Sequence, residues 1–188
     1  MIDSFAARTI AALRDLSHIE RTENNVHIVP EVYFSWDAEQ AEVSVTLSTA
    51  QDRLLHADIN VSGQPRWLGL NIGLGVGTLN RGDQIVVVMD FAAEMTDKFQ
   101  LALISSADGK RADTSLQEPI AGLSKCAVQT IVHDIDQDDA HAGEEAFHTL
   151  AIRLPANSHT LRLDDLRVTV VPRAKSARAA RRTLSDFA

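Results

Sequence analysis

Residues 67–77 read Trp67-Leu68-Gly69-Leu70-Asn71-Ile72-Gly73-Leu74-Gly75-Val76-Gly77. The even positions are all large and apolar, while the odd positions after Trp67 are all glycine or asparagine. A period of two places successive side chains on opposite faces of a β-strand. The stretch therefore predicts a strand that fills a core with one face and leaves its other face almost without side chains.

A strand face without side chains usually means that something approaches the backbone closely, because glycine otherwise weakens a strand. Two interpretations of this face stay open. In the first, the N-terminal helix or a loop packs against it. In the second, the face is the flat floor beneath a ligand, with Trp67 at its end and Asn71 as its polar side chain.

The same period of two recurs along most of the chain from about residue 29. Residues 42–48 and 55–62 alternate apolar with polar side chains, as half-buried strands do. Further strands are expected at 31–36, 66–76, 84–91, 99–105, 127–134, 148–154 and 160–171, which makes about nine. Turn sequences lie between them at Ser62-Gly63, Asn80-Arg81-Gly82-Asp83, Asp108-Gly109 and Pro155-Ala156-Asn157-Ser158. Short strands at this spacing predict an all-β fold, an antiparallel β-sandwich of the jelly-roll type.

The N-terminal residues follow a different period. An amphipathic helix is predicted over residues 3–19, where apolar side chains recur at spacings of three to five: Phe5, Ile10, Leu13, Leu16 and Ile19. Its apolar stripe should lie over a sheet face or edge, or dock onto a partner subunit. The expected organisation is a helix and linker over 1–28, a β-sandwich domain over 29–172 and a basic tail over 173–188.

Charge is distributed unevenly along the chain of 188 residues, whose net charge is -8. Residues 1–172 carry 13 basic and 25 acidic side chains, whereas residues 173–188 carry five basic and one acidic. The acidic body should repel polyanions, so nucleic acid is an unlikely partner. The tail, by contrast, could contact an acidic partner.

Composition excludes several classes of protein. A single cysteine, Cys126, cannot form an internal disulfide, and no paired Cys/His spacing indicates a structural zinc site. No apolar run approaches the roughly 18 residues of a transmembrane helix, and charged residues stand where a secretory leader would have its apolar core. We therefore expect no transmembrane segment and a cytoplasmic location, with the chain standing alone or as part of a larger assembly.

Catalytic motifs are also missing from the sequence. It contains no nucleophile elbow, P-loop or dinucleotide-binding glycine motif. Residues 73–77 are similar to a nucleotide loop only superficially, because they continue an alternating strand. The prediction is that the protein is not an enzyme, with an enzyme built on a jelly roll as the minor alternative.

Two acidic clusters are candidate metal ligands, and Ca²⁺ is the possible cofactor. Asp134, Asp136, Asp138 and Glu145 fall at positions 1, 3, 5 and 12 of a calcium loop of the EF-hand type, although position 6 is Asp139 where that loop needs glycine. The alternative is an acidic, solvated hairpin loop.

The second acidic cluster is the pair Asp164-Asp165. The apolar positions are odd before this pair and even after it, which predicts a β-bulge there. A cation site is possible at these two side chains. Hydrogen bonds from backbone or arginine donors are the structural alternative.

Two segments of the chain carry recognisable patterns: residues 79–91, with Gly82-Asp83 leading into an aliphatic strand, and the closing segment 160–168, with Asp164-Asp165 between aliphatic positions. Together they resemble jelly-roll carbohydrate-binding modules and galactose-binding-like domains. The resemblance implies a β-sandwich that binds glycans through aromatic platforms on a concave sheet or through loops at one end. It also implies a structural Ca²⁺ held partly by a last-strand aspartate, here Asp164 or Asp165.

The resemblance gives candidate ligand-binding residues and a function. The candidate platforms are Trp67, Trp36 and Tyr33, beside Asn71 on the glycine-rich strand. The predicted function is a non-catalytic binding module for a glycan or glycoconjugate. The alternative is a structural or protein-protein interaction domain of a larger assembly, with the N-terminal helix contacting a protein partner or a second copy of the chain.

Overall fold

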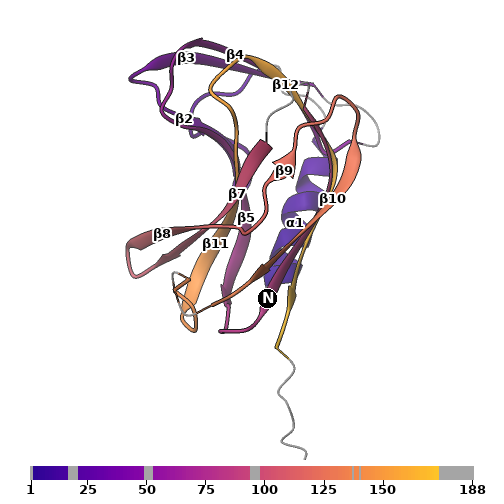
Figure 1. The fold of residues 1–188 in the computed structure, drawn as a ribbon. Helices are drawn as coiled ribbons and strands as arrows, with labels where there is room; N and C mark the ends of the chain where they lie inside the picture. Colours follow the sequence, from indigo (N-terminus) through magenta and orange to yellow (C-terminus); the bar gives the residue numbers. More distant parts are fainter. Residues whose placement is uncertain are drawn as a thin grey trace, which may run out of the picture.

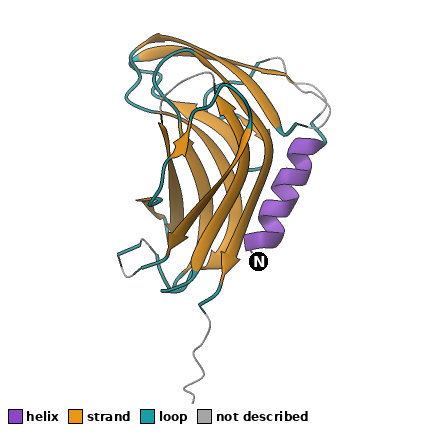
Figure 2. Cartoon of the chain, turned by 45° about the vertical axis from the view of Figure 1, so that its right-hand side comes forward, coloured by secondary structure: helices purple, strands orange, loops and turns teal. Residues whose placement is uncertain are grey.

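The computed structural model describes residues 2–16, 21–48, 53–93, 98–136, 138–139 and 141–173. These residues form one α-helix and twelve β-strands, arranged as two stacked sheets with the helix at their side (Figures 1 and 2). In chain order they are α1 (Ile2–Arg14), β1 (His27–Val29), β2 (Val32–Trp36), β3 (Ala41–Ser48), β4 (Leu55–Gly63), β5 (Leu68–Thr78), β6 (Gln84–Ala93), β7 (Lys98–Ala107), β8 (Lys110–Ser115), β9 (Ile120–Ala121), β10 (Ala127–Asp134), β11 (Glu145–Arg153) and β12 (His159–Val171).

Both sheets are antiparallel throughout the described residues. The first sheet has the strand order β1-β2-β5-β11-β7-β8, with the short β9 also pairing with β7. The second sheet has the order β10-β6-β12-β4-β3. Neighbours in each sheet are mostly distant in sequence, as crossing between two layers requires. The predicted antiparallel β-sandwich of the jelly-roll type is confirmed.

The core lies between the sheets, where the inward faces of their strands meet. Three phenylalanines are its largest fully buried side chains, namely Phe34 on β2, Phe91 on β6 and Phe99 on β7. The rings of Phe91 and Phe99 meet edge to face across the two sheets, with centroids 5.1 Å apart. This is one of the geometries that aromatic pairs prefer.

Strand β5 confirms the alternation predicted for it over its first seven residues. Leu68, Leu70, Ile72 and Leu74 are all buried in the core. The alternation was wrong at Val76, which is exposed. The reason is a β-bulge opposite β11, where the register steps from Gly73 to Gly75 and Gly75 takes a φ of 92°. The extra residue, Leu74, turns every later side chain of the strand to the opposite face.

The predicted bulge in the last strand is present. The register of β12 against β6 shifts between Leu163 and Asp165, so that one extra residue is absorbed at Asp164. Leu161 and Leu163 before the shift, and Leu166 and Val168 after it, therefore all point into the core. The change of the apolar positions from odd to even numbers was enough to locate this bulge.

Three of the twelve strands were not predicted, and they are short or polar. β1 and β9 have only three and two residues, and β1 begins inside the stretch assigned to the linker. β8 has six residues and no large apolar side chain. It follows directly from the predicted Asp108-Gly109 turn, whose two residues both have positive φ and join β7 to β8 as a hairpin.

Helix α1 closes one side of the sandwich (Figure 2). β2 pairs with only residues 68–72 of β5, and β4 pairs with only residues 159–163 of β12. The remaining lengths of β5 and β12 have a free edge in the described structure, and α1 packs against both strands. Covering open edges in this way protects them from pairing with other chains.

The buried stripe of α1 consists of Ala6, Ile10 and Leu13, which belong to the core. Two polar contacts fix its position. Thr9 Oγ1 donates to the Gly73 carbonyl over 3.3 Å, and Arg14 pairs with Asp165 over 2.8 Å. The predicted packing of the helix on a sheet edge is confirmed, and its apolar stripe is occupied within the chain. The helix ends at Arg14, earlier than predicted, and the predicted Ile19 lies outside the described residues.

Replacing Leu13 with alanine is expected to lower the free energy of unfolding by about 3 kcal/mol, because the substitution leaves a cavity where the helix meets the core. Chemical denaturation followed by circular dichroism measures this change. Ala11→Ser, on the exposed side of the same helix, is the control and should change stability by about 0.5 kcal/mol or less. A loss below about 1 kcal/mol for Leu13→Ala would show that α1 does not belong to the core.

Two further observations complete the fold. In the described part of the chain, no helix has the length and apolar character needed to cross a membrane. The predicted basic tail falls almost wholly outside the described residues, which end at Arg173.

Candidate functional site

The outer face of the first sheet, which points away from the core, carries small side chains at its centre. The strand register places Asn71 of β5 between Tyr33 of β2 and Ala151 of β11. Ala151 in turn lies beside Ala102 of β7. Ala102, Ala151 and Ile104 form a small buried apolar cluster separate from the main core. Because the side chains at the centre of this face are small, they leave room above the backbone.

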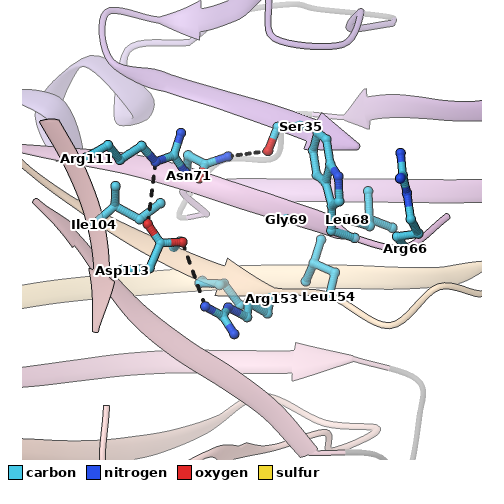
Figure 3. Close-up of a pocket in the computed structure, with 13 residues that line it drawn as sticks. Ser35, Arg66, Leu68, Gly69, Asn71, Ile104, Arg111, Asp113, Arg153 and Leu154 are labelled. Atoms are coloured by element: carbon cyan, nitrogen blue, oxygen red, sulfur yellow. Dashed lines mark hydrogen bonds and ion pairs between the residues drawn. The ribbon is translucent and has the colours of Figure 1, made fainter. Parts of the chain in front are cut away.

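A cavity of about 340 Å³ lies on this face, and we call it the groove (Figure 3). Its floor includes Gly69 and Asn71, and its sides come from β7, β8, β11 and the segment before β5. In Figure 3, Arg111 and Asp113 lie toward one end of the groove and Arg66 at the other. The lining residues are Ser35, Arg66, Trp67, Leu68, Gly69, Asn71, Ile104, Arg111, Asp113, Ala151, Ile152, Arg153 and Leu154.

The two interpretations of the glycine-rich face apply to different parts of it. At Gly73 the face is covered, because an added Cβ would lie 2.5 Å from the Cβ of Glu31 in the turn between β1 and β2. At Gly69 an added Cβ would meet only the carbonyl oxygen of Ile152 within 4 Å, at 3.3 Å. The face is therefore covered by a turn at Gly73 and forms the floor of the groove at Gly69.

The three candidate aromatic platforms have different surroundings. Trp67 lines the groove and is 49% exposed. Trp36 is 6% exposed and belongs to the core, so its expected role as a surface platform is corrected. Trp36 comes three residues after Tyr33 on β2, so the two side chains lie on opposite faces of the strand, and that of Trp36 faces the core. Tyr33 is half-buried on the outer face, outside the lining of the groove, where its ring stacks on His27 at 5.1 Å.

Asn71 is held in place on the floor of the groove. Its Nδ2 donates to Ser35 Oγ over 2.8 Å and to the Tyr33 carbonyl over 3.5 Å. Both partners belong to β2, the neighbouring strand. The amide is therefore oriented before any ligand arrives, which lowers the entropic cost of binding.

An ion pair fixes the segment that carries Trp67. Arg66 Nε donates to Oδ2 of Asp37, and Arg66 Nη2 donates to Oδ1 of Asp37 over 3.1 Å and to Glu39 over 3.0 Å. The backbone N–H of Asp37 also donates to the carbonyl of Trp67 over 3.1 Å. The hydrogen bond from the Arg66 side chain lowers the pKa of Asp37 from 3.8 to about 2.

Replacing Asp37 with asparagine should remove part of the acid sensitivity of the fold. The folded-state pKa of Asp37 is below its ordinary value, so its contribution is present above about pH 4 and is lost as the pH falls toward 2. The variant should be less stable than the natural chain at pH 7, and the difference should shrink on acidification. Urea unfolding between pH 7 and pH 2 measures it, with Glu39→Gln as the exposed control. Parallel pH profiles for the natural chain and Asp37→Asn would contradict the prediction.

A second charged group lies across the groove from β8 to β11. Asp113 is 3.5 Å from Arg111 Nε and 3.9 Å from Arg153 Nη2. Arg111 and Asp113 are two residues apart on β8 and therefore share a face, as the alternation of a strand requires. These contacts are looser than the pair of Arg66 with Asp37.

The predicted metal ligands of the last strand are engaged by arginines. Asp164 lies 2.8 Å from Arg162 and 3.8 Å from Arg53. Asp165 lies 2.8 Å from Arg14 and 3.0 Å from Arg167. Arginines engage both carboxylates at the bulge, as the structural alternative predicts, although the buried Oδ1 of Asp164 has no hydrogen-bond partner in the described structure. The cation site at these two side chains stays a prediction.

The four predicted ligands of the acidic loop do not converge on one point in the described structure. Asp134 accepts from Gln84 over 2.7 Å, and Asp136 accepts from the backbone N–H of Asp138 over 2.8 Å. Glu145 is the first residue of β11 and pairs with Thr78 of β5. In the part of the chain that the structure describes, no group of three or more His, Cys, Asp and Glu side chains is placed to hold a metal ion.

Sequence reasoning found Trp67 and Asn71 in the groove but missed its charged residues. Arg111, Asp113 and Arg153 come from two strands that are far apart in sequence, and only the pairing of both β8 and β11 with β7 brings them together. One signal was available for β8. A polar segment with charges at alternate positions follows the Asp108-Gly109 hairpin turn, which puts Arg111 and Asp113 on one face.

Comparisons with known proteins agree on the fold. No protein-family model and no curated protein sequence matches this chain. Among solved structures, a CBM4 carbohydrate-binding module has a TM-score of 0.51 at 16% identity, covering 76% of this chain and 86% of its own. The family 11 carbohydrate-binding module of a cellulosomal cellulase from Clostridium thermocellum has a TM-score of 0.50 at 11% identity, covering 85% and 99%.

A Stig cyclase from Fischerella sp. TAU is similar to the same degree. Its TM-score is 0.53 at 11% identity, and the match covers 87% of this chain and 96% of the cyclase. Identities this low establish a shared architecture and no more. The predicted resemblance to jelly-roll carbohydrate-binding modules is therefore confirmed as a resemblance of fold.

Proposed function

We propose that this chain is a non-catalytic glycan-binding module and that the groove is its binding site. The observation that carries the proposal is the half-exposed indole of Trp67 at the border of a groove whose floor is open at Gly69. A volume of about 340 Å³ is at the small end of the range for ligand sites. The jelly-roll fold shared with carbohydrate-binding modules supports the proposal.

The chemistry of the lining suits a sugar. A pyranose ring has an apolar C–H face and a rim of hydroxyl groups, so its binding site needs a flat apolar surface beside planar polar groups. Trp67 supplies a large apolar surface at low cost in side-chain entropy. Asn71, Asp113 and Arg153 supply amide, carboxylate and guanidinium groups, which form hydrogen bonds with hydroxyls as donors or acceptors.

The small number of carboxylates in the groove favours binding without catalysis. Glycoside hydrolysis ordinarily uses two carboxylates, one as acid and one as base or nucleophile. The residues that line the groove include one carboxylate, Asp113, which is held between two arginines. Cys126 is not among the residues that line the groove, and burial together with the nearby Asp164 raises the pKa of its thiol to about 11.

Isothermal titration with a panel of soluble oligosaccharides tests the proposal. The panel contains neutral β-glucan and xylan fragments together with uronic-acid-containing oligosaccharides. Saturable binding of at least one member, weakened by Trp67→Ala, is expected. The absence of binding to every member, or equal binding by the natural chain and Trp67→Ala, would overturn it.

A further inference from the structure

Positive charge is concentrated in the groove although the chain as a whole is acidic. Arg66, Arg111 and Arg153 line it, and Asp113 is its one carboxylate. The whole chain carries 18 basic and 26 acidic side chains. The side chains that line the groove therefore carry a net positive charge, opposite in sign to the net charge of the whole chain.

The three arginines differ in how fully their charge is compensated. Arg66 has two carboxylate partners of its own, since Asp37 and Glu39 both accept from it. Arg111 and Arg153 share the single carboxylate of Asp113, at distances of 3.5 Å and 3.9 Å. Their side chains are 60% and 51% exposed. Two cations thus face one anion at this end of the groove, with a net charge of one positive unit.

Guanidinium groups are suited to bind a carboxylate. Each has five N–H donors in a planar fork that matches the two oxygens of a carboxylate. The contacts of Arg111 and Arg153 with Asp113 use only part of this capacity. A second carboxylate that reached these arginines would neutralise the remaining charge and form charge-assisted hydrogen bonds.

We propose that the groove selects glycans bearing carboxylate groups, that is, uronic-acid-containing chains; this inference rests on the proposed function. Arg111 and Arg153 bind the carboxylate of one sugar unit, and Trp67 packs against a sugar ring of the same chain. One unit of excess charge matches carboxylates that are spaced along an oligosaccharide. The dense charge of nucleic acid fits poorly, because the acidic body of the protein repels it.

The test compares each acidic oligosaccharide with its own neutral form. Oligogalacturonate, oligomannuronate and a glucuronic-acid-substituted xylo-oligosaccharide are titrated into the full chain, each beside the same compound after chemical reduction of its carboxyl groups. At least one acid should bind about tenfold more tightly than its reduced form, and the difference should shrink as salt is added. Arg111→Gln should weaken binding of the acid by about tenfold and change binding of the reduced form little, whereas Arg153→Gln should weaken binding of both forms and that of the acid more.

Matched controls separate the groove from general charge effects. Lys110→Gln removes one positive charge from the exposed start of β8, outside the lining of the groove, and should leave binding unchanged. A sulfated oligosaccharide is included, and tighter binding of it than of every carboxylated one would overturn the carboxylate assignment.

The outcomes distinguish this inference from the function on which it rests. Equal binding of acid and reduced forms, or no effect of either arginine variant, overturns the inference and leaves glycan binding intact. No binding of any saccharide overturns both. An acidic peptide of polyglutamate that binds as tightly as the oligosaccharides, and independently of Trp67, would overturn the inference in favour of a protein partner.

Discussion

Replacing Trp67 with alanine is expected to weaken glycan binding by about thirtyfold and to change the free energy of unfolding by no more than about 0.5 kcal/mol. The two halves of this prediction follow from one fact. Trp67 is 49% exposed and borders the groove, so its ring contributes more to the binding surface than to the core. Truncation of an aromatic residue that anchors a ligand typically costs about 2 kcal/mol of binding free energy.

Titration calorimetry with the tightest-binding oligosaccharide of the panel measures the first half, and urea denaturation measures the second. Val128→Ala is the control, because this valine is 69% exposed on β10 of the other sheet. It should leave both quantities unchanged. An unchanged affinity of Trp67→Ala would place the glycan away from the groove, while a large loss of stability would show that the indole belongs to the core.

Replacing Phe91 or Phe99 with alanine is expected to lower the free energy of unfolding by about 4 kcal/mol. Phe91 lies on β6 of the second sheet and Phe99 on β7 of the first, and both rings are fully buried. A loss of this size is a large share of the total stability of an ordinary domain, which is about 5 to 15 kcal/mol. Both variants should therefore melt at much lower temperatures than the natural chain.

The double variant tests whether the two rings connect the sheets. Their centroids are 5.1 Å apart and their planes meet at 75°, which favours an edge-to-face attraction. The double-mutant cycle should give a coupling free energy of about 1 kcal/mol between Phe91 and Phe99. Strict additivity of the two single losses would contradict the packing of the two sheets described above.

The sequence predicted those strands whose side chains alternate and missed those that bury little. Nine strands have an apolar face that must be buried, and this requirement shows in their period. β8 buries almost no apolar surface, because it extends the sheet through backbone pairing with β7, so its sequence carries no such period. Backbone pairing leaves little trace in the order of side chains.

The two bulges also show that prediction from sequence depends on large side chains. The bulge at Asp164 was predictable, because leucine and valine positions change parity on either side of it. The bulge at Gly75 was not predictable, because the neighbouring odd positions are glycine and give no sign of which face they occupy. A register shift is visible in the sequence only where large side chains mark both faces.

The groove was predictable only in part, for a related reason. Asn71 lies on β5 and Trp67 directly before it, within the stretch whose unusual alternation is visible in the sequence. Arg111 and Arg153 belong to β8 and β11, and the order β5-β11-β7-β8 that places them beside β5 is a property of the whole fold. Trp36 was assigned to the surface because it is aromatic, although its place in the alternation of β2 put it in the core.

The position of the glycan site is tested most directly by NMR, through the chemical-shift changes that an oligosaccharide of the panel causes in the full chain. The largest changes should occur at the indole N–H of Trp67, at the backbone amides of Gly69 and Asn71, and at Arg153. Changes concentrated on residues 134–145 or on the outer face of the second sheet would contradict a glycan site in the groove. So would the absence of any change with every oligosaccharide tested.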